Sequence, residues 1–320
     1  MSGSRAEAVP TVEPDRARRH QLARQHLEPR SATAGVVPVA DDLVGLHATD
    51  PASPYLSLHA RMTAFRAADL EQALYERRSL LRLKCMRGTV FVVSRELAPV
   101  LFAATRAVTP GAGPPLAEPG AGGLRQVGAA GARRARGRAA GRCGAAGAAP
   151  RRRQAARRRL HALRRGADRP EPDGPATLHD VAWWMGLPVR RVRAAVGALG
   201  AAVEPVRLPG ASEDHLCAAG DLADLTAGPA PAPGGVALLP QLDPFLMGYH
   251  DRDRLLDPTL RRFVVDRGGN ATSVALDDGR VVGVWDLVDR PTPTVRLLLF
   301  DPGHTRRNEV IERCAAVGAF

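Results

Sequence analysis

Through the first hundred residues, apolar side chains recur at the three-to-four-residue spacing of helices that bury one face. This spacing predicts helices over residues 16–27, 36–46, 55–63 and 68–76. We expect Asp15 to cap the first helix, because a short carboxylate can accept from exposed amides at a helix start. The Asp50-Pro51 pair should separate the second helix from the third, since proline disfavours the helical conformation in the residue before it.

A β-hairpin is predicted next, over residues 80–86 and 90–93, which are rich in apolar, aromatic and β-branched side chains. Arg87-Gly88-Thr89 forms its turn, and a further helix should start near Ser94. Three helices followed by a hairpin are typical of a winged-helix domain, which grips DNA by groove and backbone. Other small α+β domains share this outline, so both alternatives stay open.

A helix-turn-helix signature lies in the second half of the chain. Thr177 and Asp180 resemble a capping box at the start of a helix that contains Trp183 and Trp184. A glycine turn and Pro188 then precede a helix over residues 189–199, which exposes arginines on one face. Such a unit either reads DNA or only packs against other domains. We expect the two tryptophans to be core and interface residues rather than base-stacking platforms.

The C-terminal part is rich in predicted strands and closes with a helix. Strand-length segments are residues 236–242, 270–276, 280–287 and 294–300, and the closing helix is predicted over 308–317. A polar cluster at 243–253 could be a site, although Asp-Pro turns and Arg-Asp pairs are more often structural. The fold class is therefore α+β: tandem winged-helix domains followed by a small β-rich, barrel-like C-terminal domain.

Charge is concentrated in one low-complexity segment. The net charge is +12, yet residues 119–167 contain fourteen arginines and no acidic residue, so the remainder is near neutral. Global basicity is thus no evidence that the folded domains bind DNA. Residues 107–170 are alanine-, glycine- and arginine-rich, and we interpret them as a basic linker, with a scrambled middle winged-helix domain or a DNA-tethering arm as alternatives.

The predicted organisation has five parts. These are a disordered N-terminus at 1–14, a first winged-helix domain at 15–106, the linker at 107–170, a winged-helix domain at 171–230 and a β-rich domain at 231–320. The start of the chain has no apolar segment of the kind found in secretory signals, so we expect a cytoplasmic, nucleoid-associated protein with no membrane partner. The four cysteines are widely spaced, which argues against a zinc site or a disulfide framework.

The stretch Gly45-Leu46-His47-Ala48-Thr49-Asp50 places polar side chains between two predicted helices. His47, Thr49 and Asp50 should therefore lie at a helix end, where they can face a partner. Imidazole, hydroxyl and carboxylate groups together can hold and deprotonate a water molecule. The alternative is that these side chains only cap the helix end.

Taken together, these motifs resemble those of the AlkZ-like tandem winged-helix DNA glycosylases. The resemblance rests on segments that occur in the same order here: residues 45–49 with 55–56 and 60–61, 86–89, 174–187, 238–249 and 279–285. Their matches cover residues 16–106 and 171–320. The resemblance implies winged-helix modules and a β-rich domain around double-stranded DNA, and excision of alkylated or crosslinked purines without metal or cofactor.

One departure from the family concerns the chemistry. Characterised members resembling this chain carry two glutamines that position the attacking water, whereas the matching positions here are His47 and Thr49. We expect His47, Thr49 and Asp50 to be the catalytic residues of a monomeric enzyme. The alternative is a non-catalytic winged-helix protein, regulatory or architectural. The candidate phosphate contacts are Arg61, Arg82, Arg87, Arg190, Arg191 and Arg193.

Overall fold

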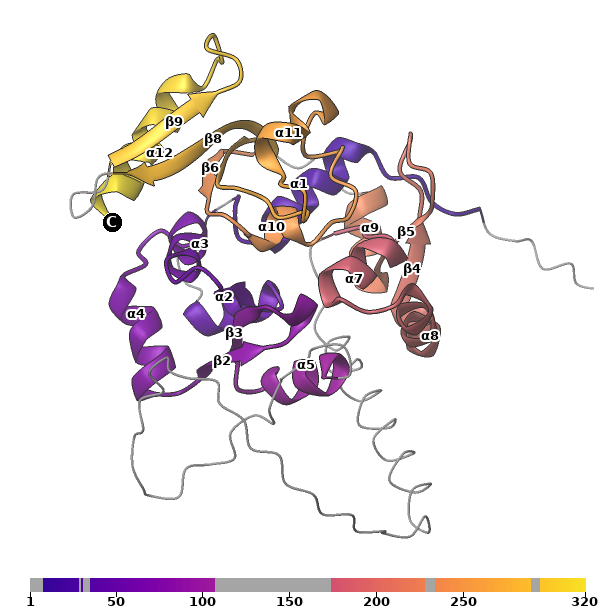
Figure 1. Ribbon diagram of the computed structural model, residues 1–320. Helices are drawn as coiled ribbons and strands as arrows, with labels where there is room; N and C mark the ends of the chain where they lie inside the picture. Colours follow the sequence, from indigo (N-terminus) through magenta and orange to yellow (C-terminus); the bar gives the residue numbers. More distant parts are fainter. Residues whose placement is uncertain (1–7, 29, 31–34, 107–173, 228–233, 289–293) are drawn as a thin grey trace, which may run out of the picture.

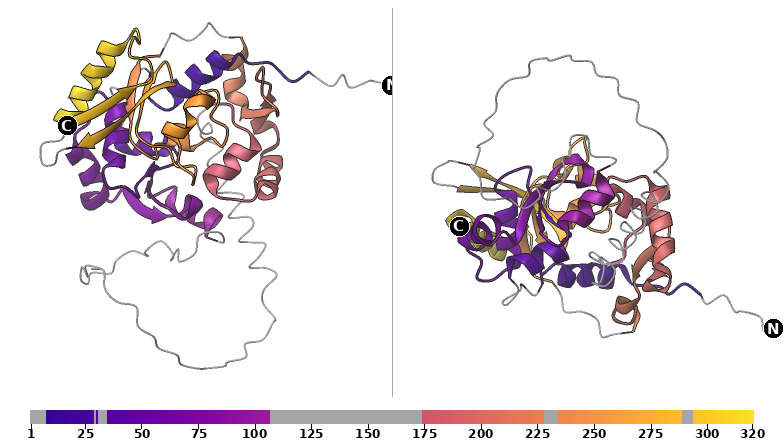
Figure 2. Two further views of the ribbon diagram at one scale, coloured as in Figure 1. Left: turned by 45° about the horizontal axis from the view of Figure 1, so that its top comes forward. Right: turned by 90° about the horizontal axis from the view of Figure 1, so that it is seen from below.

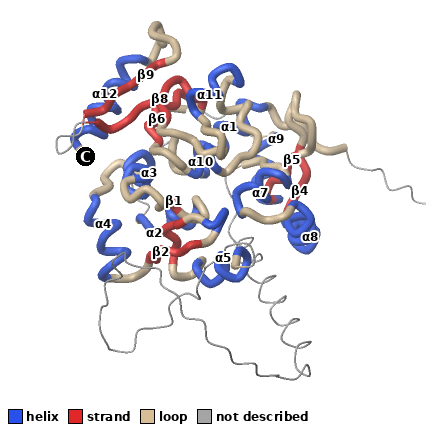
Figure 3. Tube along the Cα trace, in the orientation of Figure 1, coloured by secondary structure: helices blue, strands red, loops and turns tan. Residues whose placement is uncertain are grey.

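The computed structural model describes residues 8–28, 30, 35–106, 174–227, 234–288 and 294–320. It is a mixed α+β structure in which helices surround three small antiparallel sheets (Figures 1 and 3). Of the N-terminus predicted to be disordered at 1–14, residues 1–7 lie outside these residues, as does the predicted linker at 107–170. The prediction is wrong for residues 8–14, because Val12 is buried, its amide donates to the Arg207 carbonyl at 2.8 Å, and a helix begins at Pro14. No helix in the described part of the chain combines the length and apolarity needed to cross a bilayer.

The N-terminal unit combines helices with a three-stranded sheet of order β1-β3-β2. Strands β2 and β3 form the predicted hairpin, with Leu81 opposite Val93 and Leu83 opposite Phe91. A two-residue strand, β1, pairs with the other edge of β3. The elements are α1 (Pro14–Arg24), α2 (Val36–Asp42), β1 (Leu46–His47), α3 (Ser53–Arg61), α4 (Ala67–Glu71), a π-helical turn (Gln72–Glu76), β2 (Leu80–Lys84), β3 (Val90–Ser94) and α5 (Ala98–Thr105).

The predicted helix over 36–46 is wrong at its end, because α2 stops at Asp42 and Leu46 belongs to β1. Val44 and Gly45 have positive φ angles of 53° and 115°, which reverse the chain between the helix and the strand. A Cβ atom on Gly45 would lie only 2.9 Å from Val93 Cγ1. Glycine is therefore required both by its backbone conformation and by the close approach of β3.

The start of α1 also differs from the prediction. Glu13 occupies the N-cap position, and Asp15 lies within the first turn. There its carboxylate accepts a hydrogen bond from Arg18 at 2.6 Å. Arg18 is buried and also bonds Asp278 of the C-terminal domain, so α1 lies between that domain and the α9 region (Figure 2).

The N-terminal sheet separates two apolar cores because alternate side chains of a strand point to opposite faces. Leu46 and Val92 face the core built with α2, α3 and α4. Leu83 and Phe91 belong to a second core, which is shared with Trp184 and the C-terminal domain. His47, which is paired with Phe91, therefore lies on the side where the three parts of the molecule meet.

The helix-turn-helix prediction is confirmed at the level of secondary structure. Thr177 and Asp180 form the capping box, and Gly186 ends the first helix in the left-handed conformation. Val192 is the buried anchor of the second helix. The unit comprises α7 (Leu178–Met185), α8 (Val189–Leu199), the hairpin β4 (Val203–Val206) and β5 (His215–Ala218), and α9 (Leu222–Thr226).

The C-terminal domain is a four-stranded antiparallel sheet of order β6-β7-β8-β9 with α12 packed against it. Within the described residues β6 and β9 are its edges, so these strands form an open sheet rather than the barrel-like one expected. The strand predicted over 270–276 is shorter than expected, because it begins only at Val274. The elements are β6 (Val236–Leu239), α10 (Pro244–Met247), α11 (Arg261–Val264), β7 (Val274–Asp277), β8 (Arg280–Val288), β9 (Thr294–Leu299) and α12 (Arg307–Ala319).

Candidate active site

His47 lies on β1, and its side chain is only 5% exposed. Its ring meets Phe91 edge-on, with the centroids 4.9 Å apart, and Phe91 in turn meets Trp184 at 5.4 Å. This row of rings joins β1, β3 and α7. The expectation that His47 would sit at a helix end is therefore wrong: it lies on a strand, fixed by pairing across the sheet.

Burial, together with the nearby positive charge of Arg87, lowers the pKa of His47 from 6.5 to about 4. Asp243 and Asp50 oppose this shift because their negative charges favour the protonated ring. His47 is thus a neutral imidazole at pH 7. Its Nδ1 accepts a long hydrogen bond of 3.5 Å from the Thr49 amide, which leaves the ring proton on Nε2.

Thr49 and Asp50 lie in the loop between β1 and α3, where Thr49 is exposed and Asp50 is half-buried. The Asp50 carboxylate accepts from the Ser53 amide at 3.0 Å and from its hydroxyl at 2.9 Å. The Ser53 hydroxyl also lies 3.2 Å from the Gln241 carbonyl oxygen. The loop is thereby tied to the first turn of α3 and to the C-terminal domain.

Arg61 is misassigned as a phosphate contact, because its side chain is completely buried. Its guanidinium binds both carboxylate oxygens of Asp243, at 2.7 and 2.8 Å. Its other N–H groups donate to the Ser57 carbonyl and to the backbone and side-chain oxygens of Gln25. All five donors are used within the protein, so Arg61 joins α3 to the C-terminal domain and has none left for DNA.

Asp243 is correspondingly structural, in line with the interpretation favoured for its cluster. Beyond Arg61, it accepts from the Ser57 hydroxyl at 2.6 Å and from the Phe245 amide at 3.0 Å. The second of these bonds caps α10. A carboxylate with this many charged and neutral donors holds two domains together and has little capacity for further chemistry.

Arg87 lies in the turn of the β2–β3 hairpin, which packs against α7. Its guanidinium is 3.9 Å from the centroid of the Trp183 ring, within the range of a cation–π interaction. Burial lowers the pKa of Arg87, and the charge of Asp266 opposes that shift. A Cβ atom on Gly186 would meet the Arg87 amide nitrogen at 2.8 Å, so the glycine permits this close contact.

The remaining candidate arginines are exposed on two separate elements. Arg82 points outward from β2, and the other three lie on α8. A shallow hollow of about 490 Å³ follows one side of α8. The predicted arginine-bearing face of this helix is thus present, and it comprises Arg190, Arg191 and Arg193.

The sequence interpretation missed several residues that surround His47 or Trp183. Phe91 and Trp184 were assigned to a hairpin and a core without reference to His47. Arg252 is 2% exposed and donates to the Leu246 and Gly269 carbonyls at 2.8 and 2.9 Å, and burial lowers its pKa to about 10. The sequence analysis placed Arg252 in the polar cluster at 243–253, but nothing in the sequence shows that this arginine, rather than the neighbouring Arg254, is the one buried against the Leu246 and Gly269 carbonyls. Trp183 contacts arginines and donates to Met247, which confirms an interface role.

Within the described residues, no group of three or more His, Cys, Asp or Glu side chains could hold a metal ion. Cys85, Cys217 and Cys314 are buried and form no disulfide, and Cys143 lies outside the described residues.

Comparison with known proteins identifies the family of this chain. The family model "DNA glycosylase AlkZ-like" matches residues 40–173 and 173–320. The chain therefore belongs to the AlkZ-like DNA glycosylase family.

Two similar proteins come from Streptomyces sahachiroi. An interstrand DNA cross-link repair glycosylase is 32% identical over 121 residues, which are 37% of this chain and about a third (32%) of that protein. The solved structure of Streptomyces sahachiroi DNA glycosylase AlkZ aligns over 97% of this chain and 96% of its own, with a TM-score of 0.66 and 17% identity. The structural likeness shows a shared fold.

Proposed function

We propose that the chain is a monofunctional DNA glycosylase that hydrolyses the N-glycosidic bond of alkylated or crosslinked purines. The observation that carries this proposal is the family match on both sides of the low-complexity segment. The relative named for interstrand cross-link repair supports the substrate class. The neutral His47 beside exposed Thr49 supplies a place for the reacting water.

In the proposed reaction the bond between C1′ of deoxyribose and N9 of the purine breaks, and its electrons leave with the base. An alkylated purine already carries a positive charge, so it departs as a neutral molecule without needing an acid. Water adds to the electron-poor C1′ and loses a proton, which leaves an abasic site. The enzyme must therefore hold the water, stabilise the sugar cation and accept one proton.

The three candidate residues divide these tasks. With Nδ1 facing the Thr49 amide, neutral His47 presents an Nε2–H that can donate to the water and orient it. The Thr49 hydroxyl can accept from the same water. Asp50, whose charge influences His47, stabilises the cationic sugar and is the proton acceptor. A neutral imidazole suits this role because it adds no positive charge beside the developing cation.

Four exposed arginines and the half-buried Arg87 would hold the DNA around this site. In the proposed arrangement two winged-helix units, at 15–106 and 171–230, flank duplex DNA, and a monomer suffices. Arg82 and Arg87 contact phosphates from the first hairpin, and the arginine-bearing face of α8 contacts them from the second unit. Such an enzyme would work in the cytoplasm on nucleoid DNA, without metal or cofactor.

The test is an incision assay with a duplex that carries one N7-alkylated purine, in which alkali cleaves any abasic site. We expect cleavage with the wild-type protein and a loss of 100-fold or more in the rate for the double variant His47→Ala/Thr49→Ala. The matched control is His179→Ala, which removes an exposed histidine from α7. Equal rates for the three proteins would overturn the assignment of these residues.

The second candidate is a non-catalytic winged-helix DNA-binding protein. It is favoured by the replacement of the family's two glutamines and by the burial of His47, which is 5% exposed. This alternative predicts wild-type DNA binding without any alkali-sensitive product. The double variant His47→Gln/Thr49→Gln distinguishes the two candidates further, because product from that variant alone would indicate a fold that has lost its catalytic pair.

A further inference from the structure

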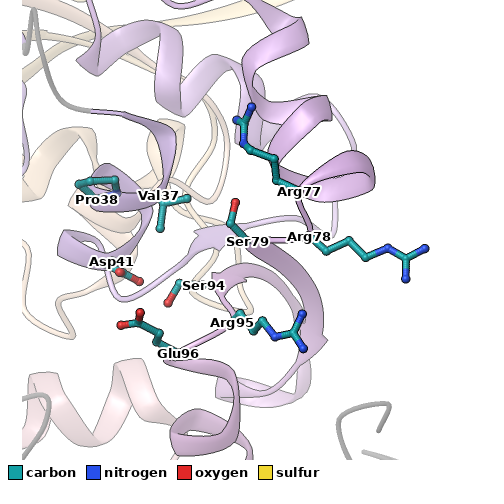
Figure 4. Close-up of a pocket in the computed structure, with 9 residues that line it drawn as sticks. All are labelled: Val37, Pro38, Asp41, Arg77, Arg78, Ser79, Ser94, Arg95 and Glu96. Carbon is teal, nitrogen blue, oxygen red and sulfur yellow. The ribbon is translucent and has the colours of Figure 1, made fainter. Parts of the chain in front are cut away.

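A hollow that no part of the proposed site uses lies at the opposite end of the β2–β3 hairpin from Arg87. It has a volume of about 530 Å³. Three segments meet there: the start of α2, the turn into β2 and the turn that leaves β3. The residues that line it are Val37, Pro38, Asp41, Arg77, Arg78, Ser79, Ser94, Arg95 and Glu96 (Figure 4).

The hollow is held open by the backbone of the hairpin. Leu80 pairs with Ser94, and the Arg95 amide donates to the Ser79 carbonyl at 2.9 Å. The Ser94 hydroxyl oxygen accepts from the Leu97 amide at 3.1 Å, which fixes the turn into α5. The arginines on its rim thus extend from a rigid frame.

The charges are separated across the hollow. Figure 4 shows Asp41 and Glu96 close together beside α2, whereas Arg77, Arg78 and Arg95 lie on the other side, and all three arginines are exposed. Arg77 donates to the neutral side chain of Gln72 at 2.9 Å. Neither Arg77 nor Arg78 forms an ion pair with a carboxylate in the described part of the chain. Their guanidinium groups remain able to bind an anion.

This arrangement favours an extended polyanion over a small one. The three guanidinium groups diverge in Figure 4 and cannot converge on a single phosphate. The carboxylates of Asp41 and Glu96 would repel a phosphate that entered the hollow. An anion is therefore held at the rim, where successive phosphates of a strand can each meet one arginine.

The distance between the hollow and His47 suits contact with one DNA duplex at both places. Strand β3 carries Phe91, which pairs with His47, and Ser94, which lines the hollow. Three residues of a strand span about 10 Å, close to the axial length of three base-pair steps. A duplex with its target nucleotide at His47 could thus present backbone phosphates to the rim.

We infer that the arginine rim of this hollow, Arg77 with Arg78 and Arg95, is a binding site for the phosphodiester backbone of duplex DNA beside the target nucleotide. The inference rests on the proposed function for the identity of the polyanion. It adds a contact surface on the first unit that neither the helix-turn-helix unit nor the residues near His47 provide.

The test is the salt dependence of binding to an undamaged duplex, measured with the full chain. The slope of log K against log salt is negative, and each lost phosphate contact reduces its magnitude by about 0.9, so Arg77→Gln/Arg78→Gln should reduce that magnitude by about 1.8. The control Arg296→Gln/Arg307→Gln removes the same charge from exposed positions on β9 and α12 and should leave the slope nearly unchanged. Arg77→Lys/Arg78→Lys should retain the wild-type slope.

An unchanged slope in the glutamine variant, or an equal decrease in the control, would overturn the inference. Arg78 has a φ of 53°, so thermal melting must confirm that the variants fold. Should the double variant unfold, Arg77→Gln alone tests the same point with an expected decrease of about 0.9. Competition by inorganic phosphate at millimolar concentration would instead indicate a small-anion site. Release of an alkylated base by the wild-type protein is measured separately, and its absence would count against the proposed function rather than against this DNA contact.

Discussion

At the scale of single residues, His47 shows how far a side chain's chemistry depends on its surroundings. In the sequence it is a histidine between two apolar segments, which suggests an exposed helix end. In the structure it pairs with Phe91, 44 positions away, and the Phe91 ring in turn contacts the Trp184 ring. Its low pKa follows from this burial, and no local sequence pattern specifies it.

The low pKa of His47 predicts a pH-dependent stability. In the unfolded chain His47 is protonated below about pH 6.5, whereas in the folded protein it becomes protonated only below about pH 4. Stability is therefore complete above pH 6.5 and is lost as the pH falls towards 4, by up to about 3 kcal/mol from this residue. Urea unfolding at pH 7.5 and 4.5 measures the loss.

His47→Gln should remove that part of the loss. Burial also lowers the pKa values of His59 and His215, so some dependence on pH will remain in the variant. Wild type and variant must consequently be compared at both pH values. If both proteins lost the same free energy between pH 7.5 and 4.5, His47 would not be the buried neutral group described above.

At the scale of elements, the sequence predicted what short-range interactions determine. The β2–β3 hairpin and the Thr177–Asp180 capping box depend on residues a few positions apart, and both are present. The predicted end of α2 was wrong because the true end depends on Val93, which packs against Gly45 and is distant in the sequence. The prediction that Arg61 contacts phosphate was wrong for the same reason, since its partner Asp243 is 182 positions away.

The Arg61–Asp243 pair carries a prediction about how α3 is held. Arg61→Ala leaves a buried carboxylate without its partner, so we expect a loss of about 3–5 kcal/mol in the free energy of unfolding. Arg66→Ala is the matched control, because it breaks an exposed pair with Asp69 and should cost under about 1 kcal/mol. Denaturant titration of both variants gives the comparison. Equal losses would mean that the buried network does not join the two domains.

At the scale of the whole molecule, the candidate site lies where three units meet. β1 and β3 supply His47 and Phe91, α7 supplies Trp184, and the loop before α10 supplies Asp243. The sequence predicted the order of these units and their helices and strands. Their mutual placement depends on contacts between residues far apart in the sequence, such as Arg61 with Asp243, which are 182 positions apart, and could not be deduced from local patterns.

The central claim is that this chain removes an alkylated base from DNA by hydrolysis. The most direct measurement is mass spectrometry of the free base released from a duplex containing N7-alkylguanine under single-turnover conditions. The wild-type protein should release the intact alkylated base in amounts equal to the abasic sites formed, and His47→Ala/Thr49→Ala should release it at least 100-fold more slowly. Wild-type protein that binds the duplex but releases no base would contradict it.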